Sequence, residues 1–416
     1  MAPDRYMRRV VVTGMGVVSP LGNTIESFEQ NLFAGMNGIG PITRFDSSNH
    51  SVHLAAEVKN LDINAYIEPK EERRMDRFSI LAMVAAAHAL DQSGLLVDMD
   101  PNRVGVIIGS GIGGIQTWED QHTRLLEKGP RQISPFFVPM MISDIASGRV
   151  SITYGLKGPN YGIVSACATA SHSIGDAYRL IQVGDADAMV TGGSEAPITP
   201  LSIAGFTSMR AMTKNPDPAS ASRPFDAGRD GFVIGEGAGV LVLEALEHAR
   251  KRGAQILGEL TGYGATADAY HITAPAKGGE GAVRAMNFAM QNGGVTPEEV
   301  GYINAHGTST PYNDKNETIA IKTVFGEHAR KLVVSSTKSM TGHLLGASGG
   351  IEAIGTLLAL QRQEAPPTIN YTTADPDCDL NYSPNTKTPH SFEYALSNTF
   401  GFGGHNAVLM MKRHAA

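Results

Sequence analysis

A cysteine in an unusual local setting is the first candidate for chemistry in this 416-residue chain. Cys167 stands between a short predicted strand, residues 161–166, and a segment from Ala170 whose apolar residues recur at helical spacing. A thiol at the start of a helix faces unpaired N–H groups and the positive end of the helix dipole, which favour the thiolate. The alternative is a buried structural cysteine. The other polar groups of the chain decide between these two interpretations.

Three further stretches are rich in polar residues although each follows an apolar, strand-like segment. They are residues 304–311, 335–343 and 397–406. In α/β sheets, ligand sites gather beyond the carboxyl ends of parallel strands. We therefore expect Cys167 to meet His306, Lys338 and His343 at one site.

A cysteine with two histidines, and no acid to orient either of them, is not typical of a hydrolase. The set fits transfer of an acyl group to a thiolate, followed by stabilisation of a second carbonyl as it becomes an enolate. A zinc site is not favoured, because the histidines lack close ligand pairing and only one cysteine is near. Each histidine alone could be a packing residue, and Lys338 a surface residue. Their coincidence at strand ends favours a functional site.

The elements that must position these residues form two similar series. In each series an opening strand precedes a strand that ends in glycine, and a third strand feeds a helix with polar residues at its start. Strands that alternate with helices predict parallel sheets covered by helices. We expect an α/β protein whose two halves, residues 8–254 and 255–414, pack into a five-layered body. The polar helix starts of the two halves would face one another.

Composition excludes several classes of protein. The net charge of −7 and the isoelectric point near 6.0 argue against a protein that binds nucleic acid. No apolar run approaches the length of a membrane span, and residues 1–9 lack the apolar stretch of a secretory signal. With two cysteines there is no disulfide framework, so we expect a reducing compartment, the cytoplasm.

Two glycine clusters resemble nucleotide-binding loops without their context. Residues 14–16 follow a strand but do not open a helix, and residues 109–114 lack the Lys-Ser/Thr of a P-loop. We therefore reject a dinucleotide loop at 14–16, and expect the cluster at 109–114 to serve tight backbone packing or the wall of a narrow tunnel. The proline-broken segment 118–150, rich in methionine and phenylalanine, is expected to be a lid or an oligomer interface.

Four motifs, taken in order, resemble one known family. They are Ser-Ala-Cys-Ala-Thr at 165–169, Asn-Ala-His-Gly-Thr-Ser-Thr at 304–310, Lys-Ser-Met-Thr-Gly-His at 338–343 and Phe-Gly-Phe-Gly-Gly at 400–404. The chain resembles the β-ketoacyl-acyl-carrier-protein synthases, most closely synthase II, from Val10 to Lys412. The resemblance implies a thiolase-like αβαβα sandwich of two pseudo-symmetric halves, usually a homodimer. It also implies two-carbon elongation of fatty acyl chains by decarboxylative Claisen condensation.

The resemblance assigns the central chemistry to five residues. Cys167 would be the nucleophile that receives the acyl chain from acyl carrier protein. His306 and His343 would bind the malonyl thioester carbonyl and assist decarboxylation. Lys338, paired with Glu317, would orient the site.

Other positions are implied in the same way. The backbone N–H groups of Cys167 and Phe402 would form the oxyanion hole, and Asp268 would lie in a second mobile loop beside that of Phe400. The substrate-binding positions are Phe400 as the gate, Thr308 and Thr310 on the pantetheine arm, Ile112 and Phe206 in the acyl pocket, and Phe137 reaching in from a partner subunit.

The resemblance also bears on partners and cofactors. A basic patch for the acidic carrier protein matches Lys70, Arg73, Arg74 and Arg210, although the charge cluster at 70–74 could equally be a solvated helix start. No redox cofactor or catalytic metal is implied, since the pantetheine arm arrives on the carrier. Some relatives hold a structural monovalent cation, and the matching positions are Asn304, Glu352, Ser397 and Asn398.

Two alternatives remain within reach of the sequence. One is the ketosynthase of a polyketide pathway. The other is a non-condensing chain-length partner, a class that usually lacks the cysteine. Degradative thiolases need a second active-site cysteine, and Cys378, in its acidic surroundings, does not fit that role. The synthase III type has asparagine at the position of His343, so this histidine argues against that type.

Overall fold

The computed structural model describes residues 7–97 and 99–414 of the chain. The sequence predicts no secretory signal in residues 1–9, and residues 1–6 of that segment lie outside the described residues. Ten strands form one continuous sheet in the order β10-β9-β13-β14-β8-β1-β7-β6-β4-β5. The strands of the first half are β1 (Val10–Val18), β4 (Val104–Gly109), β5 (Asn160–Tyr161), β6 (Ala188–Glu195) and β7 (Gly237–Ala245). Those of the second half are β8 (Gly258–Ala267), β9 (Val300–Asn304), β10 (Val333–Ser335), β13 (Tyr394–Gly401) and β14 (His405–Lys412).

The sheet is the sum of two equivalent five-stranded sheets. Read outward from the centre, the first half runs β1-β7-β6-β4-β5 and the second half runs β8-β14-β13-β9-β10. The two sheets join where β1 pairs antiparallel with β8 over three residues, from Val10 opposite Leu260 to Val12 opposite Gly258. This repeated strand order confirms the two pseudo-symmetric halves.

The expectation of parallel sheets is only half right. In each half the outer strands pair in parallel, β4 with β5 and β6, and β9 with β10 and β13. The inner strands β7 and β14 run antiparallel to both neighbours. Only residues 402–404 separate β13 from β14, which is enough for a hairpin but far too short for the crossover that parallel strands require.

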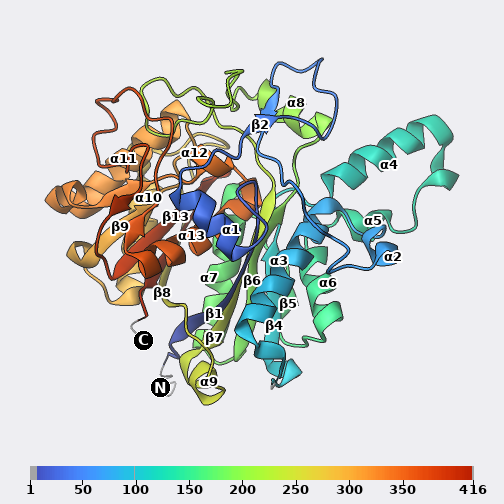
Figure 1. Cartoon of the computed structure of the whole chain (residues 1–416), viewed down its shortest axis with the longest axis horizontal. Coiled ribbons are helices and arrows are strands. Elements are labelled where there is room, and N and C mark those ends of the chain that lie inside the picture. Colours follow the sequence, from blue (N-terminus) through green and yellow to red (C-terminus); the bar gives the residue numbers. More distant parts are fainter. Residues whose placement is uncertain (1–6, 98, 415–416) are drawn as a thin grey trace.

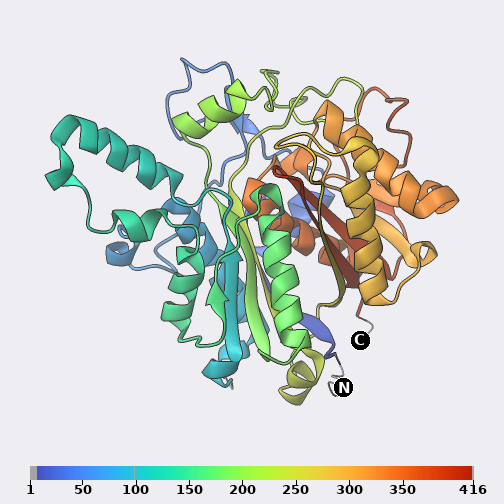
Figure 2. The same cartoon turned by 180° about the vertical axis from the view of Figure 1, so that it is seen from behind.

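Helices form the other three layers (Figures 1 and 2). Helix α3 (Arg77–Ser93) packs on β1, β7 and β6, whereas α10 (Glu280–Gly293) packs on β8 and β14 of the second half. Between the sheets, α7 (Thr169–Gln182) packs against α13 (Ser348–Arg362). Both central helices are largely buried. The result is the five-layered αβαβα sandwich expected from the sequence.

Glycines on the central strands explain how closely the outer helices approach. A Cβ atom on Gly16 would lie 1.9 Å from the carbonyl oxygen of Ala85 in α3. In the second half, a Cβ atom on Gly264 would lie 1.9 Å from the carbonyl oxygen of Ala285 in α10. The Gly14–Gly16 pair therefore serves helix–sheet packing in the first half, as Gly264 does in the second, and the rejection of a nucleotide loop is in line with this role.

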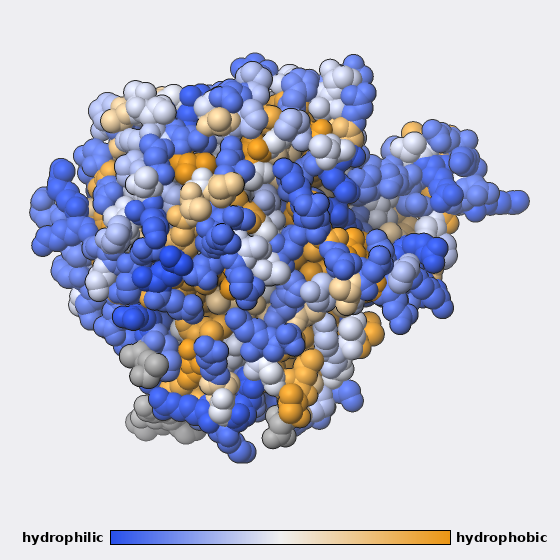
Figure 3. Space-filling model, viewed as in Figure 1, coloured by the Kyte–Doolittle hydropathy of each residue, from blue (hydrophilic) through white to orange (hydrophobic). Residues whose placement is uncertain are grey.

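Residues 118–144 of segment 118–150 project from the body as an arm, whereas Ala146 and Val150, near its end, are buried in the core. The segment contains most of α4 (Ile115–Lys128), all of α5 (Phe137–Met141) and part of α6 (Ile145–Tyr154). Figure 1 shows α4 extending well beyond the sheets, and the face seen in Figure 3 is mostly hydrophilic along this arm. Of the residues of α4, only Thr117 is buried. Helix α4 therefore contributes little to the core of this chain.

The remaining elements are short or peripheral. They are α1 (Ile25–Phe33), α2 (Pro69–Glu72), α8 (Pro200–Ser208), α9 (Leu246–Lys251), α11 (Pro311–Phe325), α12 (Lys338–Thr341), and the two-stranded ribbons β2 (Gly40–Pro41) with β3 (Leu54–Ala55) and β11 (Glu364–Ala365) with β12 (Thr388–Pro389). Among residues 7–97 and 99–414, none of the helices combines the length and apolar character that a membrane span needs.

Candidate active site

The candidate nucleophile sits in a strained turn at the start of α7. Ala166 has φ of 50°, in the left-handed region, and residues Ala166–Ala168 form a 3-10 turn that leads into the helix. Thr169 stabilises the turn, because its Oγ1 accepts from the Ser165 N–H at 2.9 Å and donates to the Ala166 carbonyl at 2.8 Å. Leu345, with φ of 47°, begins the corresponding turn before α13. The two turns pack against each other. This contact agrees with the expectation that the helix starts of the two halves face one another.

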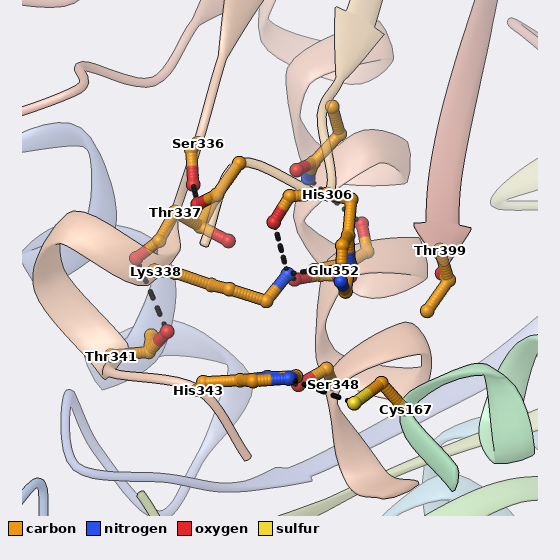
Figure 4. Close-up of polar contacts among 12 residues, drawn as sticks. Cys167, His306, Ser336, Thr337, Lys338, Thr341, His343, Ser348, Glu352 and Thr399 are labelled. Atoms are coloured by element: carbon orange, nitrogen blue, oxygen red, sulfur yellow. Dashed lines mark hydrogen bonds and ion pairs between the residues drawn. The ribbon is translucent and has the colours of Figure 1, made fainter. Parts of the chain in front are cut away.

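One histidine lies within hydrogen-bonding distance of the thiol. His343 Nε2 is 3.0 Å from Cys167 Sγ, and His343 Nδ1 is 2.9 Å from Ser348 Oγ at the start of α13 (Figure 4). The Phe232 ring meets the imidazole edge-on at 5.3 Å between centroids. The imidazole is therefore fixed by contacts on both nitrogens and on one face.

The second histidine faces the first. The rings of His306 and His343 lie 5.5 Å apart at an interplanar angle of 85°. Lys338 Nζ donates to the His306 carbonyl at 2.7 Å and lies 3.5 Å from His306 Nδ1. A donor at Nδ1 leaves the ring hydrogen on Nε2. His306 is thus held as an N–H donor beside His343.

The partner of Lys338 differs from the sequence expectation. Lys338 forms an ion pair with Glu352 of α13, and both side chains are about 1% exposed. Glu317, expected to pair with the lysine, instead accepts the backbone N–H groups of His306 and Gly307, each at 2.8 Å. The expected pairing is wrong because α11 brings Glu317 beneath the loop that carries His306, whereas α13 supplies the carboxylate beside Lys338.

Burial governs the charge of the thiol. It raises the pKa of Cys167 to about 12, and the opposing effects of the Lys338 charge and the Phe402 N–H are smaller. The helix start predicted the thiolate, but loss of hydration outweighs that preference here. Cys167 is therefore a thiol at neutral pH and needs a base. His343 is the group placed to accept its proton.

Both imidazoles are neutral at rest. Burial lowers the pKa of His306 well below its ordinary value, and the Lys338 charge acts in the same direction. Burial and the Lys338 charge likewise lower the pKa of His343. A neutral imidazole can accept a proton at one nitrogen while it donates from the other. The site therefore contains a base for the thiol and a separate N–H donor.

Glu317 provides a pH-dependent contribution to stability. Burial raises its pKa to about 7, against the opposing effect of the N–H groups of Gly307 and His306. An acid whose folded-state pKa is raised stabilises the fold below its ordinary pKa of about 4.5 and loses that contribution as pH rises through about 7. We expect Glu317→Gln to reduce the fall in the free energy of unfolding with rising pH by on the order of 1–3 kcal/mol. Urea unfolding at pH 5.5 and 8.5 measures it; equal pH slopes in both proteins would refute the assignment.

A cavity of about 660 Å³ connects this cluster to the surface. Cys167 and the two histidines lie on its wall, together with Thr308, Thr310, Glu317, Asp268, Phe206, Phe400 and Phe402. Arg210, which is exposed, also lines it. The Phe400 ring lies edge-on to His306 at 5.7 Å between centroids. The structure thus brings together most of the site residues expected from the sequence.

Other expected site residues lie away from this cavity. Ile112 packs in the same apolar cluster as Cys167 and Phe206 without lining the cavity. Phe137 begins α5 and does not line the cavity of its own chain. Its expected role, which is in a partner subunit, stays a prediction.

Gly401 allows the loop of residues 400–404 to approach the nucleophile. A Cβ atom at this position would lie 2.9 Å from the Ser165 carbonyl oxygen and 3.1 Å from the Cys167 nitrogen. Gly401→Ala is therefore expected to displace the Cys167 N–H or the loop, and to lower the rate of acyl transfer by about 10²-fold, as loss of an oxyanion donor does. Stopped-flow acylation measures the effect. Gly205→Ala is the control, since a Cβ atom there meets nothing within 4 Å; equal rates for both variants would contradict the argument.

Two residues that contribute to the site are not predicted from the sequence. Ser348 orients His343 through Nδ1, and Glu352 pairs with Lys338 rather than serving only as a cation position. A serine five residues after the histidine, where the predicted helix begins, was the available signal for Ser348. Nothing in the sequence distinguishes Glu352 from Glu317 as the partner of the lysine.

The chain is similar to known proteins over nearly its whole length. Models for the N-terminal and C-terminal domains of beta-ketoacyl synthase match residues 7–249 and 257–372. A 3-oxoacyl-[acyl-carrier-protein] synthase 2 of Staphylococcus aureus is 56% identical over 98% of this chain and 99% of its own. A protein of the same name from Synechocystis is 54% identical over 98% of each chain.

Solved structures give the same result. A beta-ketoacyl synthase from Burkholderia phymatum superposes with a TM-score of 0.92 at 36% identity, covering 98% of this chain and 100% of the other. A ketosynthase structure described as a type II polyketide acyl-carrier protein in complex with its ketosynthase bound to the hexaketide gives 0.91 at 35% identity, with the same coverage. With the domain models and near-full-length relatives in agreement, the chain belongs to the beta-ketoacyl synthase family.

Proposed function

We propose that this protein is a condensing acyltransferase that extends fatty acyl chains by two carbons on acyl carrier protein. The observation that carries the proposal is the buried set of Cys167, His306 and His343, with one imidazole 3.0 Å from the thiol and the other facing it. The relatives at 54–56% identity, named 3-oxoacyl-[acyl-carrier-protein] synthase 2, support fatty acid synthesis over the polyketide alternative. The presence of Cys167 speaks against a non-condensing partner.

In the first half-reaction the acyl group moves to Cys167. The thiol proton passes to His343 Nε2, sulfur attacks the acyl carbonyl, and the bond to the pantetheine sulfur breaks as that sulfur takes the proton. The oxyanion forms near the N–H groups of Cys167 and Phe402; the latter already donates to the thiol. His343 is neutral again at the end of this step.

In the second half-reaction the malonyl thioester loses CO₂ and becomes an enolate. His306 donates from Nε2 to the thioester oxygen, and His343 donates to the same oxygen. The Ser348 hydroxyl can donate or accept, so it supports His343 as a base in the first step and as a donor in the second. The enolate carbon attacks the acyl-cysteine carbonyl, the bond to the cysteine sulfur breaks, and the released thiolate takes up from solvent the one proton that the condensation consumes.

Reconstitution with carrier protein tests this function. Purified protein, malonyl-carrier protein and acyl-carrier proteins of graded chain length should yield β-ketoacyl-carrier protein and CO₂ in equal amounts. The profile over chain length measures the preference that depends on packing around Ile112 and Phe206. Products extended by several malonyl units without reduction would instead support the polyketide function.

No redox cofactor enters this proposal, but a structural monovalent cation does. Among the buried side-chain oxygens that lack a hydrogen-bond partner in residues 7–97 and 99–414 are those of all four expected cation ligands: Asn304 Oδ1, Glu352 Oε2, Ser397 Oγ and Asn398 Oδ1. Neutral oxygens with one carboxylate are suitable ligands for such an ion. These residues would hold the cation behind Lys338, where it supplies charge balance and rigidity. A melting temperature higher in KCl than in choline chloride would support the site, and equal values would refute it.

The carrier protein is proposed to dock on the expected basic residues, of which Arg210 lines the cavity. Lys70 and Arg73 are exposed on and after α2, whereas Arg74 is engaged by Glu71 and stacks over Phe136. We expect Lys70→Glu with Arg73→Glu to raise KM for the carrier about tenfold with kcat unchanged, because only charge pairing with the carrier is reversed. A parallel fall in kcat, or an equal effect of the control Lys251→Glu on α9, would argue against docking here.

We propose that the protein is a homodimer and that it is cytoplasmic. Within each subunit, we place the boundary between the two halves between residues 254 and 255. Both cysteines are free, in line with a reducing compartment. Large apolar side chains are exposed on the projecting arm, on α6, and on and just after the edge strand β5: Trp118, Leu125, Leu126, Phe136, Val138, Ile152, Tyr161 and Val164. Burial of this surface would also bring Phe137 near a partner. Sedimentation should give twice the subunit mass, and Ile152→Asp should produce monomers.

A further inference from the structure

The first turn of the nucleophile helix holds the loop of residues 400–404, here called the gate loop, at both of its ends. Ser171 Oγ lies 2.7 Å from the hydroxyl of Thr399, the residue just before the loop on β13. The next residue of the helix, His172, hydrogen bonds to the backbone carbonyl of Asn406, just after the loop on β14. Two adjacent residues of α7 thus contact both strands of the hairpin that presents Phe400.

His172 also reaches back to the turn that carries Cys167. Its Nδ1 lies 2.6 Å from Ser165 Oγ, two residues before the nucleophile. With Nε2–H donating to Asn406, Nδ1 accepts from the serine, which fixes one neutral tautomer. Burial lowers the pKa of His172 to about 4, with the charges of His405 and Arg179 acting in the same direction. The ring therefore keeps both bonds at neutral pH.

The loop itself is attached differently. Beyond the hairpin, Asn406 Nδ2 donates to Asp268 at 2.7 Å, and the Asp268 N–H donates to the Gly404 carbonyl at 2.9 Å. Gly403 and Gly404 have positive φ values, 85° and 73°, that glycine adopts without strain. The loop can therefore swing on these glycines while Thr399 and Asn406, its two ends, stay tied to α7.

We propose that Ser171 and His172 are positioning residues that fix the base of the gate loop relative to Cys167. Phe400 can then move aside for an acyl chain, and the Phe402 N–H returns each time to the same place beside the cysteine. Oxyanion stabilisation depends on that geometry, whereas simple attack by the thiol on a small alkylating reagent does not. The acyl-transfer readout of this proposal rests on the proposed function; the alkylation readout does not.

Paired substitutions at position 172 separate the two contacts. Asparagine places its amide where Nδ1 lies and can keep the bond to Ser165, but it cannot reach Asn406. Glutamine places its amide where Nε2 lies and can keep the bond to Asn406. Ser171→Ala removes the other anchor. Ser173→Ala is the matched control, because Ser173 is a buried serine of the same helix whose hydroxyl bonds only to Thr169 in that helix.

Two rates are measured for each variant: acyl transfer from acyl-carrier protein, with kcat and KM determined separately, and alkylation of Cys167 by iodoacetamide. We expect Ser171→Ala and His172→Asn to lower kcat for transfer about 10-fold or more, with KM and the alkylation rate within about twofold. His172→Gln and Ser173→Ala should stay within about threefold of the parent in both rates.

Three results would overturn the proposal: unchanged transfer in Ser171→Ala and His172→Asn, equal losses in His172→Asn and His172→Gln, or alkylation that falls in step with transfer. The last result would indicate general damage to the site. If the parent protein alkylates normally but accepts no acyl group, the proposed function fails instead, so the two failures are distinguishable.

Discussion

Cys167→Ala is expected to abolish the acyl-enzyme and to lower the condensation rate by about 10³-fold or more. The sulfur is the atom that becomes acylated, and no other nucleophile stands in its place: its neighbours across the cavity are the neutral imidazoles of His343 and His306. Alanine removes the thiol without adding bulk to the turn of residues Ala166–Ala168. Intact-protein mass spectrometry after incubation with acyl-carrier protein gives the direct measurement.

Cys378 provides the matched control. It is also a free, buried cysteine, but it lies in the apolar cluster beneath α10 and α11, away from the cavity. Burial raises its pKa to about 11, as it does for Cys167, but its sulfur hydrogen bonds to Thr318 instead of an imidazole that could accept the proton. Cys378→Ala should therefore acylate like the parent protein. A mass increase of one acyl group on the Cys167→Ala protein, or its loss from Cys378→Ala, would contradict the assignment.

The arrangement of the two halves could be predicted because it leaves a pattern in the sequence. Apolar strands, helix periods and glycines recur in the same order in both halves, and Gly16 and Gly264 make the same close contact. Strand direction could not be predicted in full. It depends on which strands are joined by short turns, and the polar stretch 397–406 reads equally well as a loop before a strand or as the hairpin it proves to be.

The residues that form the site could be predicted from the sequence, but the contacts between them could not. Motifs place Cys167, His306 and His343 at one cavity, yet they carry no information on which buried carboxylate meets Lys338. That choice follows from the packing of α13 against the loop of the lysine. The charge of the thiol was likewise beyond the sequence, because burial of the side chain opposes the helix start and is known only once the layers are assembled.

Lys338→Met is expected to destabilise the fold by about 3–5 kcal/mol, the usual result of leaving one partner of a buried ion pair alone. The ammonium group pairs with Glu352 and donates to the His306 carbonyl at 2.7 Å, and burial already raises the pKa of Glu352. Without the lysine, Glu352 must either hold an uncompensated charge or take up a proton. Urea unfolding in choline chloride measures the loss where no small cation can replace the ammonium.

Two companion variants decide whether burial is the cause. Lys338→Met combined with Glu352→Gln removes both charges, so it should recover much of the stability lost in the single variant, although not the activity. Lys315→Met breaks the exposed pair with Asp377, in which both side chains are about half exposed, and should leave the unfolding midpoint nearly unchanged. If the double variant were as unstable as Lys338→Met, the bond to His306 rather than the stranded charge would account for the loss. The lysine would then stabilise the protein mainly through its hydrogen bond to the backbone carbonyl of His306.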